Sequence, residues 1–266
     1  MRIASVQMSI KVFAGMRITA LVFIILIANP VSADQKSADP QRKGGPKVEG
    51  PPQSSPPPVA KVVYNPPKRG APDGRVAGGT RGAGAERPVL SALAPEHTGL
   101  TVQEHPTLYW FLSKAVTQPL RLTITDDQAG PPLIDTRIPP PVSPGIQGVR
   151  LADLGARLLP GIHYRWLITL GPDPDHPSGY IFAGGAIERM AFPEPLSKKL
   201  AGGSQLEVAA LYAKEGFWYD AVTTLSEMIH AAPHDPDLRA QRAALLKQIG
   251  LQEAADYDVS QATEKK

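Results

Sequence analysis

The chain has 266 residues, of which 42% are hydrophobic and 6% aromatic, and this length predicts one or two ordinary domains. Its 24 glycines and 29 prolines exceed average use and indicate long stretches that do not pack. The sequence contains no cysteine, which excludes disulfides, thiolate metal sites, a catalytic thiol and a lipidated cysteine.

Residues 1–33 have the pattern of an export signal. They contain three basic residues and no acidic one, an apolar run over residues 18–28, and the small-residue end Val31-Ser32-Ala33. We therefore expect a signal peptide that is cleaved before the next residue. The alternative is an uncleaved anchor helix, but the apolar run is shorter than the roughly 20 residues that cross a bilayer. We predict a periplasmic or extracellular location, without a stable membrane span after cleavage.

The net charge of +3 lies entirely in this signal, so the rest of the chain has 25 basic and 25 acidic side chains. A strongly basic surface is the electrostatic mark of nucleic-acid binding. The high pI of the whole chain is therefore no indication of such a function, and we predict no nucleic-acid partner.

Residues 34–97 are poor in apolar side chains and contain 12 prolines and 9 glycines. So little apolar surface cannot offset the entropy lost when a chain is ordered. We predict a disordered, proline-rich spacer over residues 34–63, extended as polyproline II where prolines cluster. Residues 64–97 differ because arginines and glycines are interleaved, and we predict an Arg/Gly-rich extended segment there.

Residues 98–192 change to a two-residue period, which is typical of half-buried strands. The run Leu120-Arg121-Leu122-Thr123-Ile124-Thr125 alternates apolar and polar side chains, and a turn-forming Asp-Asp-Gln-Ala-Gly sequence follows it. Seven short strands in about 90 residues favour an antiparallel β-sandwich of the immunoglobulin or fibronectin kind. The expected strands are residues 100–102, 107–112, 120–125, 133–138, 148–151, 163–170 and 180–188.

Tyr164 stands three residues after Pro160-Gly161, at the entry to an expected strand. This placement is similar to the tyrosine corner of such sandwiches, in which the hydroxyl bonds to upstream backbone. Tyr164 and Trp166 are then expected to point inward and Arg165 outward. The alternative is a different sandwich in which the Pro-Gly turn is fortuitous.

Residues 196–262 are expected to be α-helical and to follow the sandwich. Apolar side chains recur at helical spacing from Leu206, and glycine or proline ends each run. Asp235-Pro236 supplies a helix N-cap followed by proline at the first helical position. The three expected helices end near Gly216, Pro233 and Gly250.

Residues 209–233 resemble one tetratricopeptide-type helical hairpin. A single such repeat cannot bury its apolar face alone, so it must pack on the sandwich or on another chain. The matching positions are Tyr212, Gly216, Trp218, Ala221, Leu225 and Pro233.

From Tyr64 to Leu251 the sequence resembles a bacterial family of exported proteins known as domain of unknown function 928. The resemblance implies a signal peptide, a β-rich middle and a helical end, and it supplies no catalytic residues. Its motifs are Tyr64-Asn65-Pro66-Pro67-Lys68-Arg69-Gly70-Ala71-Pro72, Gly78-Gly79-Thr80-Arg81-Gly82, Leu93-Ala94-Pro95-Glu96, Thr101, Pro106-Thr107, Tyr109-Trp110, Tyr164-Arg165-Trp166 and Trp218-Tyr219-Asp220-Ala221.

Arg69, Arg75 and Arg81 are the candidate anion-binding residues. Glycine between them frees the backbone, and guanidinium is a bidentate donor to anions. The alternative is that they pair with acidic groups of the protein's own domains as the segment wraps around them. A nucleotide-binding phosphate loop is excluded because no Gly-Lys-Ser/Thr sequence leads into a helix.

Trp218 and Tyr219 are the candidate partner-binding residues, since these residue types anchor interfaces. The competing interpretation is that they fill the space between the helices.

We predict no catalytic residues, no metal site and no cofactor. No serine stands in a Gly-x-Ser-x-Gly turn, although a triad can assemble from distant residues. Two loops combine aspartate and histidine, but turn and cap chemistry explains both. They are residues 173–176 and 234–237.

These observations predict a non-enzymatic exported protein that binds another envelope or secreted protein through its helical face or a sheet edge. The alternative is a module that binds an anionic or carbohydrate envelope ligand through the Arg/Gly-rich segment. An enzyme with an unrecognised site is the third possibility.

Overall fold

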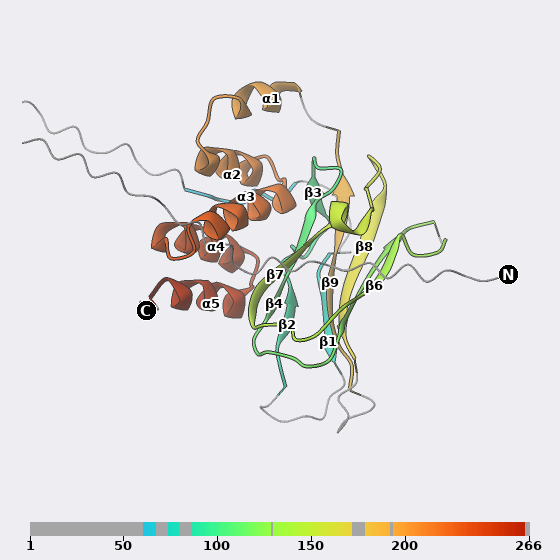
Figure 1. The fold of residues 1–266 in the computed structure, drawn as a ribbon. Helices are drawn as coiled ribbons and strands as arrows, with labels where there is room; N and C mark the ends of the chain where they lie inside the picture. The colour runs from blue at the N-terminus through green and yellow to red at the C-terminus, as the bar shows by residue number, and fades with distance from the viewer. Residues whose placement is uncertain are drawn as a thin grey trace, which may run out of the picture. The chain divides into compact units, whose positions relative to one another are not determined.

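A computed structural model of the chain describes residues 61–67, 74–79, 87–128, 130–171, 179–191 and 194–263. The expected signal peptide, the spacer up to residue 60, and Arg69 and Arg81 lie outside these residues. The described residues form two β-sheets followed by helices, in the order that the sequence predicts (Figure 1).

The first sheet has the strand order β1-β9-β8-β5-β6, and β3 also pairs with β9. The second sheet has the order β2-β4-β7. The strands are β1 (Val76–Gly79), β2 (Leu90–Ala92), β3 (Gly99–Thr101), β4 (Thr107–Leu112), β5 (Leu120–Asp126), β6 (Ile134–Ile138), β7 (Gly145–Arg150), β8 (His163–Leu170) and β9 (Ile181–Arg189).

All seven expected strands are present, each within a few residues of its predicted ends. Two further strands, β1 and β2, come from the segment predicted to be merely extended, so the sandwich begins upstream of residue 98. One pairing also departs from an all-antiparallel sandwich: β3 runs parallel to β9. Together β1 and β3 cover the outer edge of β9, β1 along its first half and β3 along its second.

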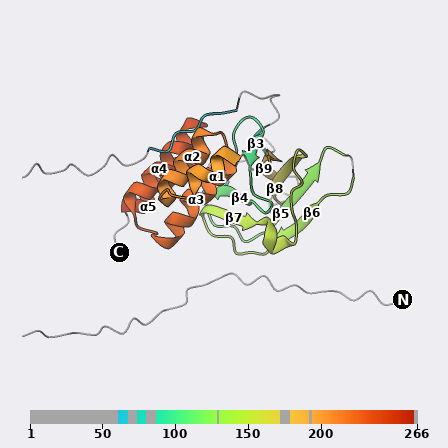
Figure 2. The same cartoon turned by 90° about the horizontal axis from the view of Figure 1, so that it is seen from above.

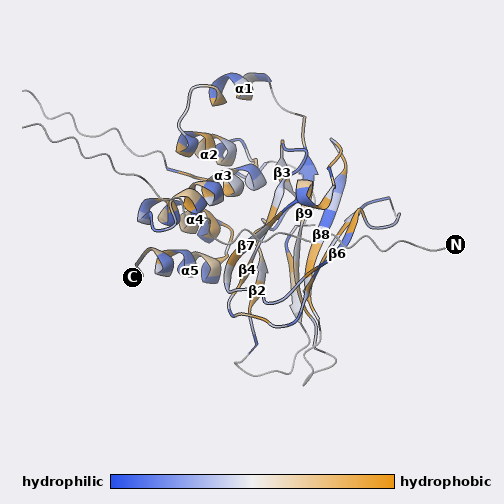
Figure 3. Cartoon of the chain, in the orientation of Figure 1, coloured by the Kyte–Doolittle hydropathy of each residue, from blue (hydrophilic) through white to orange (hydrophobic). Residues whose placement is uncertain are grey.

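One hydrophobic core contains inward-facing side chains of both sheets. Along β5, Leu120, Leu122 and Ile124 are fully buried, whereas Arg121 between them is exposed. The two-residue period therefore places one face of each strand in the core, as expected for a sandwich. Figure 3 shows this alternation of hydrophobic and hydrophilic residues along the strands.

The structure contains the hydrogen bond that defines the predicted tyrosine corner. Tyr164 is buried, and the backbone N–H of Leu159 donates to its hydroxyl at 3.2 Å. Trp166 is buried and Arg165 is exposed, as the alternation predicts.

Five helices are described after the last strand of the sandwich. A short 3-10 turn, η1 (Leu151–Leu154), lies earlier, between β7 and β8. None of the described helices is long and apolar enough to cross a membrane. Figure 2 shows the helices gathered beside the sheets. They are α1 (Glu194–Leu200), α2 (Gln205–Lys214), α3 (Trp218–Ala231), α4 (Pro236–Gln248) and α5 (Gln252–Thr263).

Local signals explain the helix ends. Ser204 and Glu207 form a capping box at the start of α2. Asp235 caps α4, with Pro236 at its first position, as predicted. Gly216 follows α2 with a φ of 87°, a left-handed conformation that glycine adopts without strain.

The first three residues of α3 attach the helices to the sandwich. The Trp218 indole N–H donates to the carbonyl of Leu93 at 2.8 Å. The Tyr219 hydroxyl accepts from the Trp166 indole at 2.8 Å and donates to the carbonyl of Ala186 at 3.1 Å. The Asp220 carboxylate accepts from the N–H of Val102 at 3.1 Å. The helical face that a single hairpin cannot bury alone is therefore buried on the chain's own sandwich.

This close approach requires a glycine at one position. A Cβ at Gly99 would lie 2.6 Å from the Tyr219 ring, a separation that real structures do not show. Glycine lets the backbone of β3 come into contact with the aromatic side chain.

Candidate functional site

The helices hold an extended piece of the chain, residues 61–67, which we call the docked segment (cyan in Figure 1). Its backbone N–H groups donate to side chains of α4: that of Val62 to Gln241 Oε1 at 3.0 Å, and that of Tyr64 to Gln248 Oε1 at 2.9 Å. The N–H of Asn65 donates to the carbonyl of Ala213 in α2 at 3.0 Å. The segment is thus bound through its main chain at three points.

Side chains of the docked segment alternate between the helices and solvent. Val62 and Tyr64 are 1% and 7% exposed, whereas Lys61, Val63 and Asn65 are exposed. Residues 61–63 therefore lie against the helices, although the sequence assigned them to the spacer. Main-chain bonds combined with buried alternate side chains are the pattern by which folded domains recognise extended polypeptides.

The largest buried side chain of the segment is Tyr64. Its ring stacks on His97 at 5.9 Å between centroids and meets Trp218 edge-on at 5.0 Å. Its hydroxyl lies 3.2 Å from His97 Nε2, and His97 Nδ1 lies 2.9 Å from the carbonyl of Thr98. Burial raises the pKa of Tyr64 well above its ordinary value. A neutral phenol therefore anchors the segment over the junction of helices and sandwich.

A hollow of about 420 Å³ runs along the other side of the docked segment. Its walls are the exposed side chains of the segment and one face of α2, so it lies beside a backbone that is already extended. Apolar Val63, Ala210 and Leu211 line it, with Lys61, Lys214 and Glu207 around them.

The two glutamines that hold the segment stand seven residues apart on α4, which brings them to one face of the helix. Sequence reasoning missed both, because glutamine on a helix is ordinarily a solvated residue. The short apolar run Val62-Val63-Tyr64 was the available signal, but its first two residues fall in the predicted spacer and Tyr64 begins the predicted Arg/Gly-rich segment.

Arg75 takes the internal role that the sequence left open for the arginines. Its guanidinium donates to the carbonyl of Ile249 at 2.8 Å and to that of Ala94 at 3.4 Å, and it pairs with Glu96 at 3.3 Å. Burial lowers the pKa of Arg75 and the charge of Glu96 raises it. Arg75 thus joins β1 to the α4–α5 turn, which is the internal pairing expected from the sequence as the alternative to anion binding. Arg69 and Arg81 lie outside the described residues.

Trp218 and Tyr219 are 0% and 1% exposed. Their indole and hydroxyl groups are engaged inside the chain, so they form the interior junction and not a surface for a partner. The prediction of a partner site at these two residues is therefore corrected by their burial.

One set of side chains has the connectivity of a catalytic triad. Thr98 Oγ1 lies 2.7 Å from His163 Nε2, and His163 Nδ1 lies 3.3 Å from Asp127 Oδ1. A catalytic hydroxyl also needs a substrate cleft and donors for the oxyanion. Thr98 lines neither the hollow beside the docked segment nor the groove described below. The contacts instead join the start of β3 to β8 and to the turn after β5.

A family model for the Domain of Unknown Function (DUF928) matches residues 76–259, more than half of the chain. The chain belongs to this family. The DUF928 region covers the described β-strands and runs into α5, so it contains the sandwich and most of the helical layer of this chain. The docked segment precedes the matched residues.

Comparison with curated proteins finds no match. Among solved structures, a multi-domain immunophilin from Arabidopsis thaliana aligns over 63% of this chain and 97% of its own, with 10% identity. The TM-score of 0.21 is too low for any inference about fold or function. The function of this DUF928 chain has to be argued from its own surfaces.

Proposed function

We propose that the chain is an exported, non-enzymatic interaction module of the cell envelope, and that its helical layer binds an extended segment of a partner protein. The observation that carries the proposal is the docked segment, held across α2 and α4 by main-chain hydrogen bonds. A surface that binds one extended chain in this way has the geometry to align a second one beside it.

The expected occupant is an acidic, extended segment that lies in the hollow between the docked segment and α2. Lys61 and Lys214 flank this hollow, and Glu207 is engaged in the capping box of α2. Carboxylates in the partner would meet the two ammonium groups, while Val63 and Leu211 would cover its apolar side chains.

Export is supported by the pattern of residues 1–33, and an interaction role by the similarity of α2 and α3 to a tetratricopeptide hairpin. Such hairpins bind extended peptides on the concave face of stacked helices. The binding alternative through the Arg/Gly-rich segment loses support, because Arg75 is occupied by internal contacts.

Site-specific photo-crosslinking tests the proposal. A benzoylphenylalanine in place of Val63 should crosslink, in intact cells, to one segment of an exported protein that is rich in Asp and Glu. Leu159 supplies the matched control position, because it is 49% exposed against 50% for Val63 and lies far from the hollow in the sequence. Lys214→Glu should abolish the crosslink at position 63. Equal crosslinking from both positions, or a crosslink insensitive to Lys214→Glu, would contradict the proposal.

A further inference from the structure

A groove separates α3 from the second sheet, on a different part of the molecule from the docked segment. It consists of two hollows, of about 690 Å³ and about 330 Å³, that share Thr107, Arg150 and Glu227 as lining residues. Volumes of this size are typical of sites for small ligands. The shared residues show that the two hollows adjoin each other along α3, and we refer to them together as the groove.

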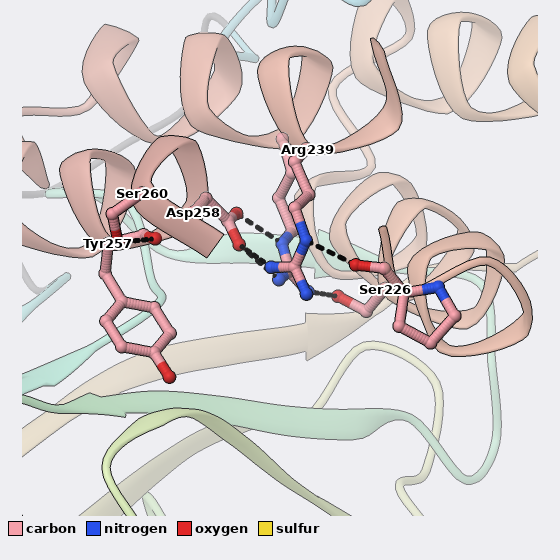
Figure 4. Close-up of polar contacts among 7 residues, drawn as sticks. Ser226, Arg239, Tyr257, Asp258 and Ser260 are labelled. Atoms are coloured by element: carbon pink, nitrogen blue, oxygen red, sulfur yellow. Dashed lines mark hydrogen bonds and ion pairs between the residues drawn. The ribbon is translucent and has the colours of Figure 1, made fainter. Parts of the chain in front are cut away.

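The larger hollow ends at a buried charge cluster (Figure 4). Asp258 is fully buried and accepts from Arg242 at 2.6 and 2.7 Å and from Arg239 at 3.1 Å. Arg242 is 6% exposed, and Ser226 of α3 accepts from it at 2.9 Å. Two guanidinium groups share one carboxylate, so these three side chains keep one positive charge, while the carboxylates of Asp153 and Glu227 also line the larger hollow.

Both arginines of this cluster line the groove. Their side chains are fixed by the buried carboxylate and by Ser226, so little side-chain entropy would be lost when a ligand binds. Arg150 stands on the opposite wall, at the junction of the two hollows. The exposed, planar Arg150 guanidinium is suited to a carboxylate or another planar anion, whereas the cluster arginines already donate to Asp258 and Ser226.

The smaller hollow is different in chemistry. Asp220 lines it and is only 3% exposed, and its Oδ1 is buried without a hydrogen-bond partner. A buried acceptor without a partner is unfavourable unless a ligand supplies the donor. Around it stand neutral hydrogen-bonding side chains, which are Thr101, Gln103, Gln205, Thr223 and Thr224.

We propose that this groove binds an acidic oligosaccharide, with a sugar carboxylate at the arginine end and hydroxyl groups of a neighbouring unit in the hollow around Asp220. A sugar hydroxyl both donates and accepts, as do threonine hydroxyls and glutamine amides. It can therefore donate to the unpartnered Asp220 oxygen and accept from the surrounding threonines and glutamines.

The carbohydrate assignment makes the groove distinct from the surface beside the docked segment. The two bind different classes of ligand and share no lining residue. Failure of one proposal therefore leaves the other unaffected.

Isothermal titration of the full mature chain with tetragalacturonate is the test. Maltotetraose, which is uncharged, and tetraglutamate, which is acidic but not a sugar, are the comparison probes. We expect tetragalacturonate to bind at least about tenfold more tightly than either, since a hydrogen bond to a charged group contributes roughly 1.5–3 kcal/mol.

Two variants locate the site. Arg150→Ala changes an exposed side chain at the junction of the hollows and should weaken tetragalacturonate binding about tenfold. Thr223→Val keeps the side-chain shape, removes one hydroxyl from the smaller hollow, and should weaken binding severalfold. Arg137→Ala, an exposed arginine on β6 in the other sheet, is the matched control and should leave binding unchanged.

Absence of tetragalacturonate binding, or equal binding of tetraglutamate, would overturn the proposal. Equal effects of Arg150→Ala and Arg137→Ala would also overturn it, because binding would then follow overall charge and not the groove.

Discussion

Replacing Asp220 by asparagine should remove a specific part of the pH dependence of stability. Asp220 is 3% exposed, and burial raises its pKa to about 7, against the hydrogen bond from the Val102 N–H that lowers it. In the unfolded chain its pKa returns to about 3.9. At a pH between these two pKa values, the Asp220 carboxyl is therefore mostly protonated in the folded protein and mostly ionised in the unfolded chain.

The sign and size of the effect follow from proton linkage. Where the folded state binds more protons, the free energy of unfolding falls as the pH rises. Each pH unit between the two pKa values is worth about 1.4 kcal/mol, so Asp220 should lower wild-type stability by up to about 4 kcal/mol between about pH 4 and pH 7. Its stabilising effect is complete below about pH 4 and is lost as the pH approaches 7.

The amide introduced by Asp220→Asn would stay neutral throughout and keep an oxygen that accepts from the N–H of Val102. Urea unfolding of wild type and Asp220→Asn at pH 4.5 and pH 7.5 provides the assay. The variant should gain stability relative to wild type at the higher pH, while other carboxyl groups cancel in the comparison. Asp153→Asn, at an exposed aspartate, is the control. A loss of stability in Asp220→Asn that is the same at both pH values would refute the reasoning.

Three further predictions concern the interior junction, the charge cluster and export. Tyr219→Phe should lower the free energy of unfolding by about 1–3 kcal/mol, because it leaves the buried Trp166 indole without an acceptor, whereas Tyr180→Phe at a half-exposed tyrosine should have no effect in the same urea titration. Asp258→Asn should cost about 3–5 kcal/mol by leaving the buried Arg242 guanidinium, and the partly buried Arg239 beside it, without their carboxylate, and Asp256→Asn, two residues away and exposed, should cost far less in the same experiment. N-terminal sequencing of the exported protein should begin at Asp34, and retention of residues 1–33 would contradict the predicted cleavage.

The strands from residue 98 onward could be predicted because each has one buried face, and burial imposes a two-residue period on the sequence. Leu120 to Asp126 is the clearest case. Tyr164 was predictable for a related reason, since its Pro-Gly turn and inward side chain are local features. The ends of α2, α3 and α4 followed from glycine and proline and from the Asp235 cap.

The strands β1 and β2 could not be predicted in this way. They are four and three residues long, and what makes them strands is pairing with β9 and β4, distant in the sequence. Helix α5 lies within the region predicted to be helical but was not predicted as a separate helix, because its apolar residues form a weak pattern and its contacts are mainly with α4.

The candidate sites depend on how the helices pack against the sandwich, which local sequence patterns do not determine. Trp218 and Tyr219 suit an interface or an interior equally well as residue types, and only packing on the sandwich decides between them. The groove likewise combines Arg150 of β7, Asp220 of α3 and Arg242 of α4, which are brought together by the tertiary fold alone.

Amide hydrogen exchange of the docked segment tests most directly the claim that the helical layer binds an extended chain through its backbone. The N–H groups of Val62, Tyr64 and Asn65 should exchange at least about a hundredfold more slowly than in a free peptide, because each donates to α2 or α4. Gln248→Ala should accelerate exchange most at Tyr64. Exchange of all three amides at free-peptide rates, while those of β8 remain protected, would contradict the account.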